Sequence, residues 1–143
     1  MTTSIPESHV DLLQQPVHGV LTTMMPDGQP QMSIVWADYD GRDVLINTTL
    51  ERQKGKNMLA NPKVNVLVID PKNGARFLEV RGEVSEVTRE EAIPHADKQT
   101  QAYSNNVQQH FYGDIYPKEQ QEKETRVIFK ISPKKVTTNA IFS

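Results

Sequence analysis

The stretch DVLINTTLERQKGKNMLANP, residues 43–62, joins a short apolar strand to a polar turn and a cationic helix start. Three cations fall within five positions where the helix begins: Arg52, Lys54 and Lys56. Positive charge at a helix N-terminus opposes the helix dipole, at a cost of roughly 0.3–1 kcal/mol per charge. A bound phosphate would supply the missing negative charge and would accept hydrogen bonds from the first-turn N–H groups and from Thr48 and Thr49. The alternative is a solvated basic helix start without a ligand, and composition alone leaves both open.

The composition limits the classes of function. With 143 residues the chain is long enough for a real core, and we expect one domain over residues 1–143. A formal net charge of −2 gives no global basic field, so we expect no nucleic-acid partner. The chain has no cysteine, and its four histidines show no paired ligand spacing, so we expect neither disulfides nor a metal site. No signal peptide or long apolar run is present, which favours a cytoplasmic protein without a membrane partner.

Alternating apolar residues and turn signals predict about six strands. The predicted strands cover residues 17–25, 30–39, 43–48, 63–69, 76–87 and 125–131, with a short edge strand or tail at 136–138. Turn residues at 26–29 and the pair Asp40-Gly41 predict hairpins, so the first three strands should form an antiparallel meander. Gly82, in the middle of the long fifth strand, predicts a bulge or a close backbone approach.

Three helices are predicted around these strands. They cover residues 5–14, 51–60 and 88–103, with Pro94 either inside the third helix or at the start of a second helix there. We expect Ser4 and Thr88 to serve as N-caps, because each precedes a glutamate by three residues in the pattern of a capping box. The polar segment 104–124 is interpreted as a helix followed by a mobile loop. Its anchors are Phe111, Tyr112, Ile115 and Tyr116.

This pattern of elements favours a barrel. Antiparallel hairpins without alternating strands and helices argue against a dinucleotide-binding Rossmann fold. The chain also contains no GxGxxG, Walker A, HExxH or GxSxG motif. We therefore expect a mainly β fold, an all-β barrel with flanking helices.

Five segments, in this order and spacing, resemble the split β-barrel flavin- and deazaflavin-binding proteins. More narrowly, they resemble the small pyridoxamine-phosphate-oxidase-like proteins that use FMN or the deazaflavin coenzyme F-420. The segments are PQMSIVW (30–36), RQKGKNM (52–58), NPKV (61–64), LEVRGEV (78–84) and TRVI (125–128). The resemblance spans about residues 9 to 138 and implies a six-stranded antiparallel Greek-key split β-barrel of the FMN-binding type. It also implies a homodimer, joined by the outer faces of strands two and five, with two cofactors between the subunits.

The resemblance implies a position for each part of the cofactor. Strand two would line the ring with its backbone, at Met32, Ser33, Ile34, Val35 and Trp36. The third strand and the following helix start would hold the phosphate, at Thr48, Thr49, Arg52, Lys54 and Lys56. Asn57 would cap the helix or bind, and Arg126 would be a basic residue that reaches the cofactor of the partner.

Other aromatic and titratable residues have simpler explanations. Trp36 fits a barrel-wall position as well as it fits ring contact. We expect Tyr103, Tyr112 and Tyr116 to pack on the barrel rather than close over a ring. We expect His95 and His110 at the surface, and Arg81 in a surface ion pair with Glu79.

The function implied by the resemblance is hydride transfer to or from a small organic substrate, with the hydride chemistry supplied by the cofactor. No acid–base pair in the sequence assigns a catalytic residue. The pattern at residues 52–57 and the strand at 78–84 look more like the deazaflavin branch, although FMN would occupy the same groove. The alternative is a non-catalytic flavin- or haem-binding protein for storage, sensing or stress response, although no histidine stands out as an axial haem ligand.

Overall fold

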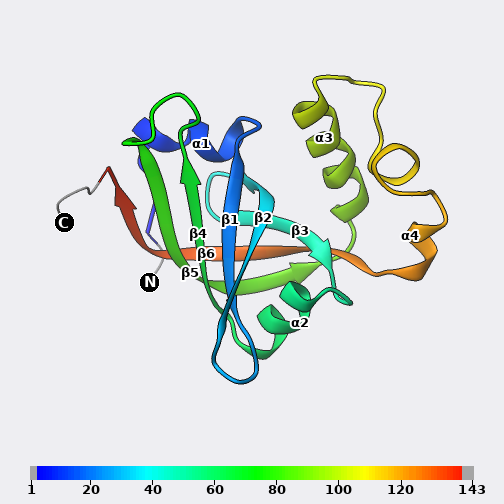
Figure 1. Ribbon diagram of the computed structural model, residues 1–143, viewed down its shortest axis with the longest axis horizontal. Helices are drawn as coiled ribbons and strands as arrows, with labels where there is room; N and C mark the ends of the chain where they lie inside the picture. The colour runs from blue at the N-terminus through cyan, green and yellow to red at the C-terminus, as the bar shows by residue number, and fades with distance from the viewer. Residues whose placement is uncertain (1–2, 140–143) are drawn as a thin grey trace.

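Six antiparallel strands close into a barrel in the computed structural model, which describes residues 3–139 (Figure 1). The strands are β1 (His18–Met24), β2 (Pro30–Tyr39), β3 (Val44–Thr49), β4 (Lys63–Ile69), β5 (Phe77–Thr88) and β6 (Arg126–Thr138). Their order around the barrel is β1-β2-β3-β6-β5-β4, and β4 pairs back to β1. The predicted fold class, with β1 to β3 as a meander, is confirmed.

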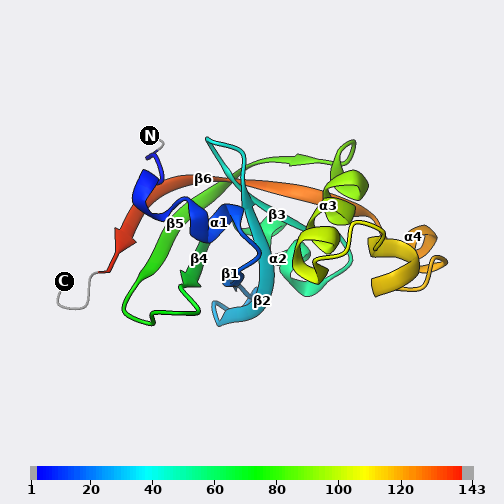
Figure 2. The same cartoon turned by 90° about the horizontal axis from the view of Figure 1, so that it is seen from above.

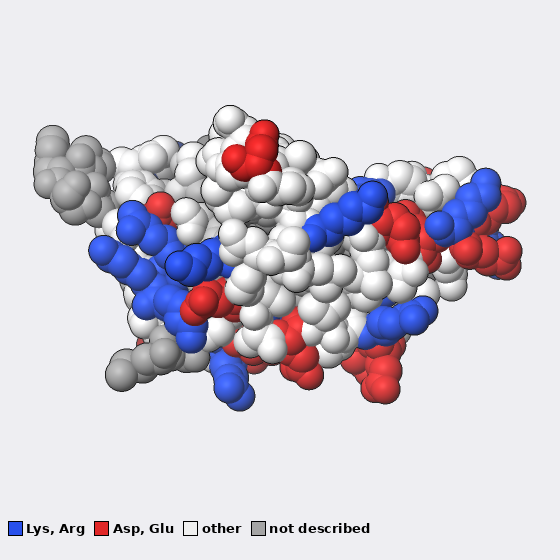
Figure 3. Space-filling view, turned by 90° about the horizontal axis from the view of Figure 1, so that it is seen from below, with Lys and Arg blue, Asp and Glu red and all other residues white. Residues whose placement is uncertain are grey.

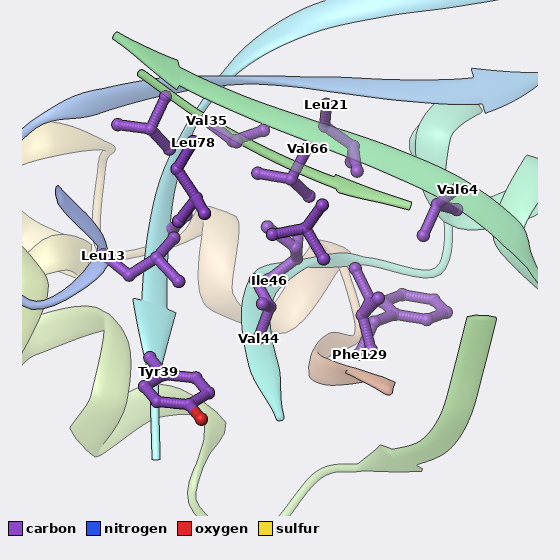
Figure 4. Packing of buried hydrophobic residues seen from close by; sticks show 14 of the residues in the cluster. Leu13, Leu21, Val35, Tyr39, Val44, Ile46, Val64, Val66, Leu78 and Phe129 are labelled. Carbon is purple, nitrogen blue, oxygen red and sulfur yellow. The ribbon is translucent and has the colours of Figure 1, made fainter. Parts of the chain in front are cut away.

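Alternation along the strands builds the core. In β5, Leu78 and Val80 point inward and are buried, whereas Arg81 is exposed and forms the predicted ion pair with Glu79 at 3.4 Å. Figure 4 shows how the inward side chains of several strands meet inside the barrel. The labelled residues are Leu13, Leu21, Val35, Tyr39, Val44, Ile46, Val64, Val66, Leu78 and Phe129. Each fully buried aliphatic or aromatic side chain contributes roughly 1.5–3 kcal/mol, so this interior is the main source of stability.

Short helices surround the barrel at its two ends and on one side (Figures 1 and 2). They are the 3-10 turn η1 (Glu7–His9), α1 (Asp11–Gln14), α2 (Gln53–Ala60), α3 (Ala92–Ser104), the irregular turn η2 (Phe111–Ile115) and α4 (Gln120–Lys123). The helix α1 lies at one end and α2 at the other, while α3, η2 and α4 lie on one side. No helix within residues 3–139 is long and apolar enough to cross a membrane.

Two of the predicted helix starts are wrong. The first helix is broken into η1 and α1, and Ser4 does not cap it because η1 begins only at Glu7, with Pro6 as the N-cap residue. Just before it, Thr3 bonds to the carbonyls of Pro133 and Lys134, which holds the chain beside β6. Thr88 does not cap the third helix because it still pairs with Ile128 in the β5–β6 ladder. The helix α3 therefore begins only at Ala92.

The end of the chain and the segment before it also differ from prediction. Residues 136–138 are not a separate strand, because β6 runs through Pro133 with a register shift opposite Arg81 and Gly82. The predicted bulge or close backbone approach at Gly82 is confirmed, because the register shifts there and a Cβ would lie 2.7 Å from the carbonyl oxygen of Ser132. Segment 104–124 does not begin with a further helix, because Asn105 adopts the left-handed conformation that ends α3.

Candidate functional site

A cavity of about 270 Å³ opens where the wall of the barrel meets the helical side of the molecule. It brings together β2, the end of β3, the start of α2, α3 and η2, which are far apart in the sequence. Its apolar and aromatic lining is Ile34, Val35, Trp36, Ala96, Phe111, Ile115 and Tyr116. Its polar and cationic lining is His18, Asn47, Thr48, Gln99, Arg52, Lys54 and Arg126.

Thr48 brings an unsatisfied hydroxyl to this cavity. The residue is only 3% exposed, and its Oγ1 has no hydrogen-bond partner among the described residues. Buried polar atoms are nearly always bonded, and leaving one unpaired costs about 1–3 kcal/mol. A ligand oxygen inside the cavity would satisfy this hydroxyl.

Two cations stand beside that hydroxyl without an acidic partner. Arg52 precedes the first residue of α2 and Lys54 follows in its first turn, and neither forms an ion pair with any residue of the described chain. Burial, together with the nearby charges of Arg52 and Arg126, lowers the pKa of Lys54. The first N–H groups of a helix also lack internal acceptors. Threonine hydroxyl, cations and helix start together form a cradle suited to a phosphate.

The close packing of α2 on β3 positions this cradle. Gly55 lies against the end of β3, where a Cβ would overlap the carbonyl oxygen of Thr49. The Thr49 hydroxyl is fully buried and accepts a hydrogen bond from the backbone N–H of Arg52 at 3.3 Å. Thr49 therefore fixes the entry into the helix rather than facing the cavity.

Other residues predicted for the site lie outside the cavity lining. Met32 and Ser33 precede the lining part of β2, and Lys56 is exposed. Asn57 is buried and has a structural role. Its side chain bonds to those of Thr23 and Gln31, at 3.1 Å each, and so ties α2 to β1 and β2. Of the predicted residues, the lining includes Ile34, Val35, Trp36, Thr48, Arg52, Lys54 and Arg126.

Arg126 packs against a wall of aromatic side chains that lies beside the cavity. Its guanidinium lies 4.2 Å from the centre of the Phe111 ring and donates to the hydroxyl of Tyr112 at 2.9 Å. Tyr112 donates in turn to Glu124, and Glu124 also pairs with Arg126 at 3.4 Å. Across the cavity, Tyr116 lies under the guanidinium of Arg52. The aromatic residues at 111–116 therefore contact the guanidinium groups of both Arg52 and Arg126.

Trp36 and Tyr103 form the other side of this wall. Their rings are stacked at 4.7 Å, and the Tyr103 hydroxyl donates to the carbonyl of Val17. Burial, with a further effect of Asp38, raises the pKa of Tyr103 to about 12. Tyr103 and Tyr112 thus pack on the barrel as predicted, whereas Tyr116 lines the cavity and Trp36 both packs and lines it.

The prediction of a surface position is confirmed for His110 and is wrong for His95. His95 is buried and bonds to Asp38 at 2.9 Å and to Asn47 at 3.0 Å. Neither Asn47 nor Gln99 was predicted to line the cavity, and no local pattern marks them, because α3 meets β3 only in the folded chain. Within residues 3–139 no group of three His, Cys, Asp or Glu side chains is placed to hold a metal ion.

A larger groove of about 670 Å³ lies elsewhere on the outer face of the barrel. Its cations are Lys63, Arg81 and Lys134. Figure 3 shows Lys and Arg side chains gathered at one end of the molecule, with acidic and basic groups mixed at the other. The unsatisfied buried hydroxyl belongs to the smaller cavity, which is therefore the better candidate site.

Comparison with known proteins agrees with the fold. The family model described as pyridoxamine 5'-phosphate oxidase matches residues 5–140. A pyridoxine/pyridoxamine 5'-phosphate oxidase of Rhodopseudomonas palustris (strain TIE-1) is 30% identical over 118 residues, or 82% of this chain and 52% of that protein. The chain thus spans about half the length of the curated relatives that it matches.

Two solved structures illustrate how far the similarity extends. An F-420 reductase has a TM-score of 0.77 and 34% identity, covering 93% of this chain and 98% of the other. A haem storage protein from Vibrio cholerae has a TM-score of 0.63 and 14% identity, covering 95% of both chains, and shares the fold alone. The family predicted from the five sequence segments is confirmed. The chain belongs to the pyridoxamine 5'-phosphate oxidase-like family of split β-barrel proteins.

Proposed function

We propose that this protein is an oxidoreductase that binds FMN or coenzyme F-420 with the phosphate in the cradle of Thr48, Arg52 and Lys54. The observation that carries the proposal is the buried, unpaired Thr48 hydroxyl beside two cations without acidic partners. FMN and coenzyme F-420 both carry a phosphate at the end of a ribityl chain. Such a phosphate would accept from the hydroxyl, the cations and the first turn of α2.

The ring would lie toward the apolar part of the cavity. The backbone of β2 at Ile34 and Val35 would lie along the ring there, and Trp36 and Phe111 would exclude water from the side. A bound flavin or deazaflavin supplies the hydride transfer itself. The chain would hold the ring against β2 and supply the Arg126 guanidinium as a donor at the cavity wall.

Coenzyme F-420 is the preferred cofactor in this proposal. The F-420 reductase is 34% identical over nearly the whole of both chains, whereas the curated oxidases are matched over only about half of their length. FMN remains the second cofactor to test, because the cradle recognises phosphate and not the ring.

We also propose that the protein is a homodimer in which β2 contributes to the interface. Met32 is 72% exposed and Ile34 is 65% exposed on the outer face of this strand, next to the cavity. Apolar side chains so exposed on adjacent outward positions are typical of an interface. Sedimentation at micromolar concentration should show a dimer, and Met32→Glu should shift it toward monomer. A wild-type monomer of 16.2 kDa would contradict this part of the proposal.

Cofactor titration tests the function. The purified protein would be titrated by calorimetry with F-420, FMN, riboflavin and the phosphate-free deazaflavin core, at low and high salt. We expect the phosphate-bearing forms to bind at least about tenfold tighter than their phosphate-free counterparts, because one charge-assisted contact contributes about 1.5–3 kcal/mol. We also expect their affinity to fall with salt.

Four other outcomes would count against the proposal. Equal affinity for the phosphate-free forms would show that the cradle of Thr48, Arg52 and Lys54 does not bind the phosphate. Absence of binding of either cofactor at high micromolar concentration would end the proposal. A bound cofactor that is not reduced or oxidised by any nicotinamide or F-420 system, or a haem spectrum in place of flavin binding, would favour a non-catalytic carrier of the same fold.

A further inference from the structure

A line of hydrogen bonds runs behind the cavity and ends at Arg126. It begins at Asp38 in β2, whose carboxylate lies 2.9 Å from His95 Nε2 in α3. His95 Nδ1 lies 3.0 Å from the side-chain amide of Asn47 in β3. The Asn47 oxygen accepts from Arg126 Nη1 at 2.9 Å in β6. Four elements are thus joined through side chains, and Asn47 and Arg126 also line the cavity.

A backbone carbonyl fixes the direction of every bond in this line. The Asn47 side chain lies 2.7 Å from the carbonyl oxygen of Ala92, which can only accept a hydrogen bond. The amide nitrogen of Asn47 must therefore face Ala92, and its second hydrogen is directed to His95. Nδ1 of His95 then has to act as acceptor, so the ring proton sits on Nε2 and is donated to Asp38.

The same orientation leaves the Asn47 oxygen free to accept from Arg126. If the amide were turned over, its oxygen would face the Ala92 carbonyl and its NH₂ group would face the guanidinium, and both contacts would be repulsive. Asp38 favours the observed arrangement: burial raises its pKa, but the hydrogen bonds from His95 and from the Tyr39 N–H outweigh burial and lower it. The side-chain oxygen of Asp38 holds the His95 tautomer by accepting the Nε2 proton.

Arg126 is further fixed by Tyr112, by Glu124 and by the face of Phe111. The charge is balanced by Glu124, whose side chain is also almost fully buried. Of the five N–H groups of a guanidinium, three have acceptors among the described residues. One hydrogen on each terminal nitrogen remains for a ligand. Arg126 is therefore a charge-balanced donor with restricted motion.

We infer that Asp38, His95 and Asn47 are positioning residues that hold Arg126 at the cavity wall as an oriented hydrogen-bond donor to the bound ring. The inference rests on the proposed function for the identity of the ligand. A donor fixed in advance stabilises charge that develops on the ring when it is reduced. It should favour the reduced cofactor over the oxidised one, whereas the phosphate cradle should bind both forms equally.

The first test needs no cofactor. In ¹⁵N NMR spectra of the free protein, we expect His95 to show the neutral tautomer with its proton on Nε2. We expect hydrogen exchange at the Arg126 side chain to be slow, and His95→Phe to accelerate it at least tenfold. The matched control is His110→Phe, which changes an exposed histidine and should leave Arg126 as it is. Arg76, which is held by Asp11 and Asp70, is the internal reference in every spectrum.

The second test uses the loaded protein. In His95→Phe the ratio of affinities for reduced and oxidised cofactor should fall about tenfold, whereas Lys54→Met should lower both affinities by the same factor. A residue that merely stabilised the fold would not change this ratio. If His95→Phe does not fold, Asp38→Ala removes the acceptor at the other end of the line of hydrogen bonds and should have the same effect on the ratio. Asp38→Asn still accepts a hydrogen bond from His95 and should behave like wild type.

The outcomes separate the two proposals. Failure of the wild type to bind either cofactor would refute the proposed function, and the exchange measurement would still decide whether the line of bonds holds Arg126. Unchanged exchange at Arg126 in His95→Phe, or in Asp38→Ala if that variant is needed, would overturn the inference. An unchanged affinity ratio would also overturn it, even if the cofactor binds as proposed.

Discussion

Replacing Lys54 by methionine should raise stability and weaken cofactor binding at the same time. Lys54 is half-buried beside Arg52 and has no ion-pair partner in the described part of the chain. Its pKa is lowered by burial and then by Arg52 and Arg126, so the folded protein disfavours the charged amine. That penalty is complete below the lowered pKa and is lost as the pH rises from the lowered pKa to the ordinary pKa of lysine. Methionine keeps the unbranched, flexible shape of most of the side chain and removes the charge.

The two effects differ in sign and size. Without ligand we expect Lys54→Met to be as stable as wild type or more stable by up to about 1 kcal/mol, since the site remains partly exposed. This would raise the melting temperature by roughly 2–4 °C for a chain of this length. With ligand, the loss of one charge-assisted contact should cost about 1.5–3 kcal/mol, or roughly 10- to 150-fold in the dissociation constant.

The assay is a melting curve without ligand and a calorimetric titration with F-420 and FMN. Lys56→Met is the matched control, because residues two apart on a helix point about 200° apart and Lys56 is exposed. The control should change affinity by less than about threefold, through screened long-range attraction alone. Unchanged affinity in Lys54→Met, or an equal loss in Lys56→Met, would refute the placement of the phosphate. Lower stability without ligand would instead indicate a structural ion pair.

Three further predictions follow from the same region. Thr48→Val should raise the stability of the free protein by about 1 kcal/mol, because it removes the unpaired hydroxyl, and should weaken phosphate-dependent binding about tenfold. Gly55→Ala should lower the free energy of unfolding in urea by at least about 2 kcal/mol, because its Cβ would overlap the Thr49 carbonyl; wild-type stability would contradict this. The lowered pKa of Asp38 gives stability that is present above its unfolded pKa and is lost as the pH falls through the folded one. In Asp38→Asn the free energy of unfolding should therefore fall less steeply with decreasing pH below about pH 4 than in the wild type, as measured by urea unfolding at several pH values.

The strands and the position of the cations at the start of α2 were predictable because they depend on local patterns. Alternation and the Asp40-Gly41 hairpin each act within a few residues, and the cations at 52–56 stand beside the helix start that they affect. Gly82 stands out because a glycine inside a strand is unusual, although the residues that it approaches, Ile131 and Ser132, lie far along the chain. The helix ends were less predictable, because tertiary pairing overrode capping. Thr88 has the sequence of an N-cap but continues a strand, since its partner Ile128 lies 40 positions further along the chain.

The remainder of the site depends on contacts that sequence spacing does not show. Asn47 meets His95 and Arg126 only because α3 folds back over β3 and because β6 pairs beside it. Nothing close to His95 in the sequence distinguishes it from the exposed His110. The aromatic wall likewise forms only when the segment at 111–116 returns to the barrel, so the sequence indicates apolar anchors there but not what they enclose.

The position of the phosphate would be settled by a crystal structure of the protein with F-420 or FMN bound. We predict a phosphate oxygen within about 2.7–3.0 Å of Thr48 Oγ1, in hydrogen-bond range, with the Lys54 amine and the first turn of α2 around it. A phosphate bound instead in the larger groove beside Lys63, Arg81 and Lys134, with Thr48 still unpaired, would contradict the account.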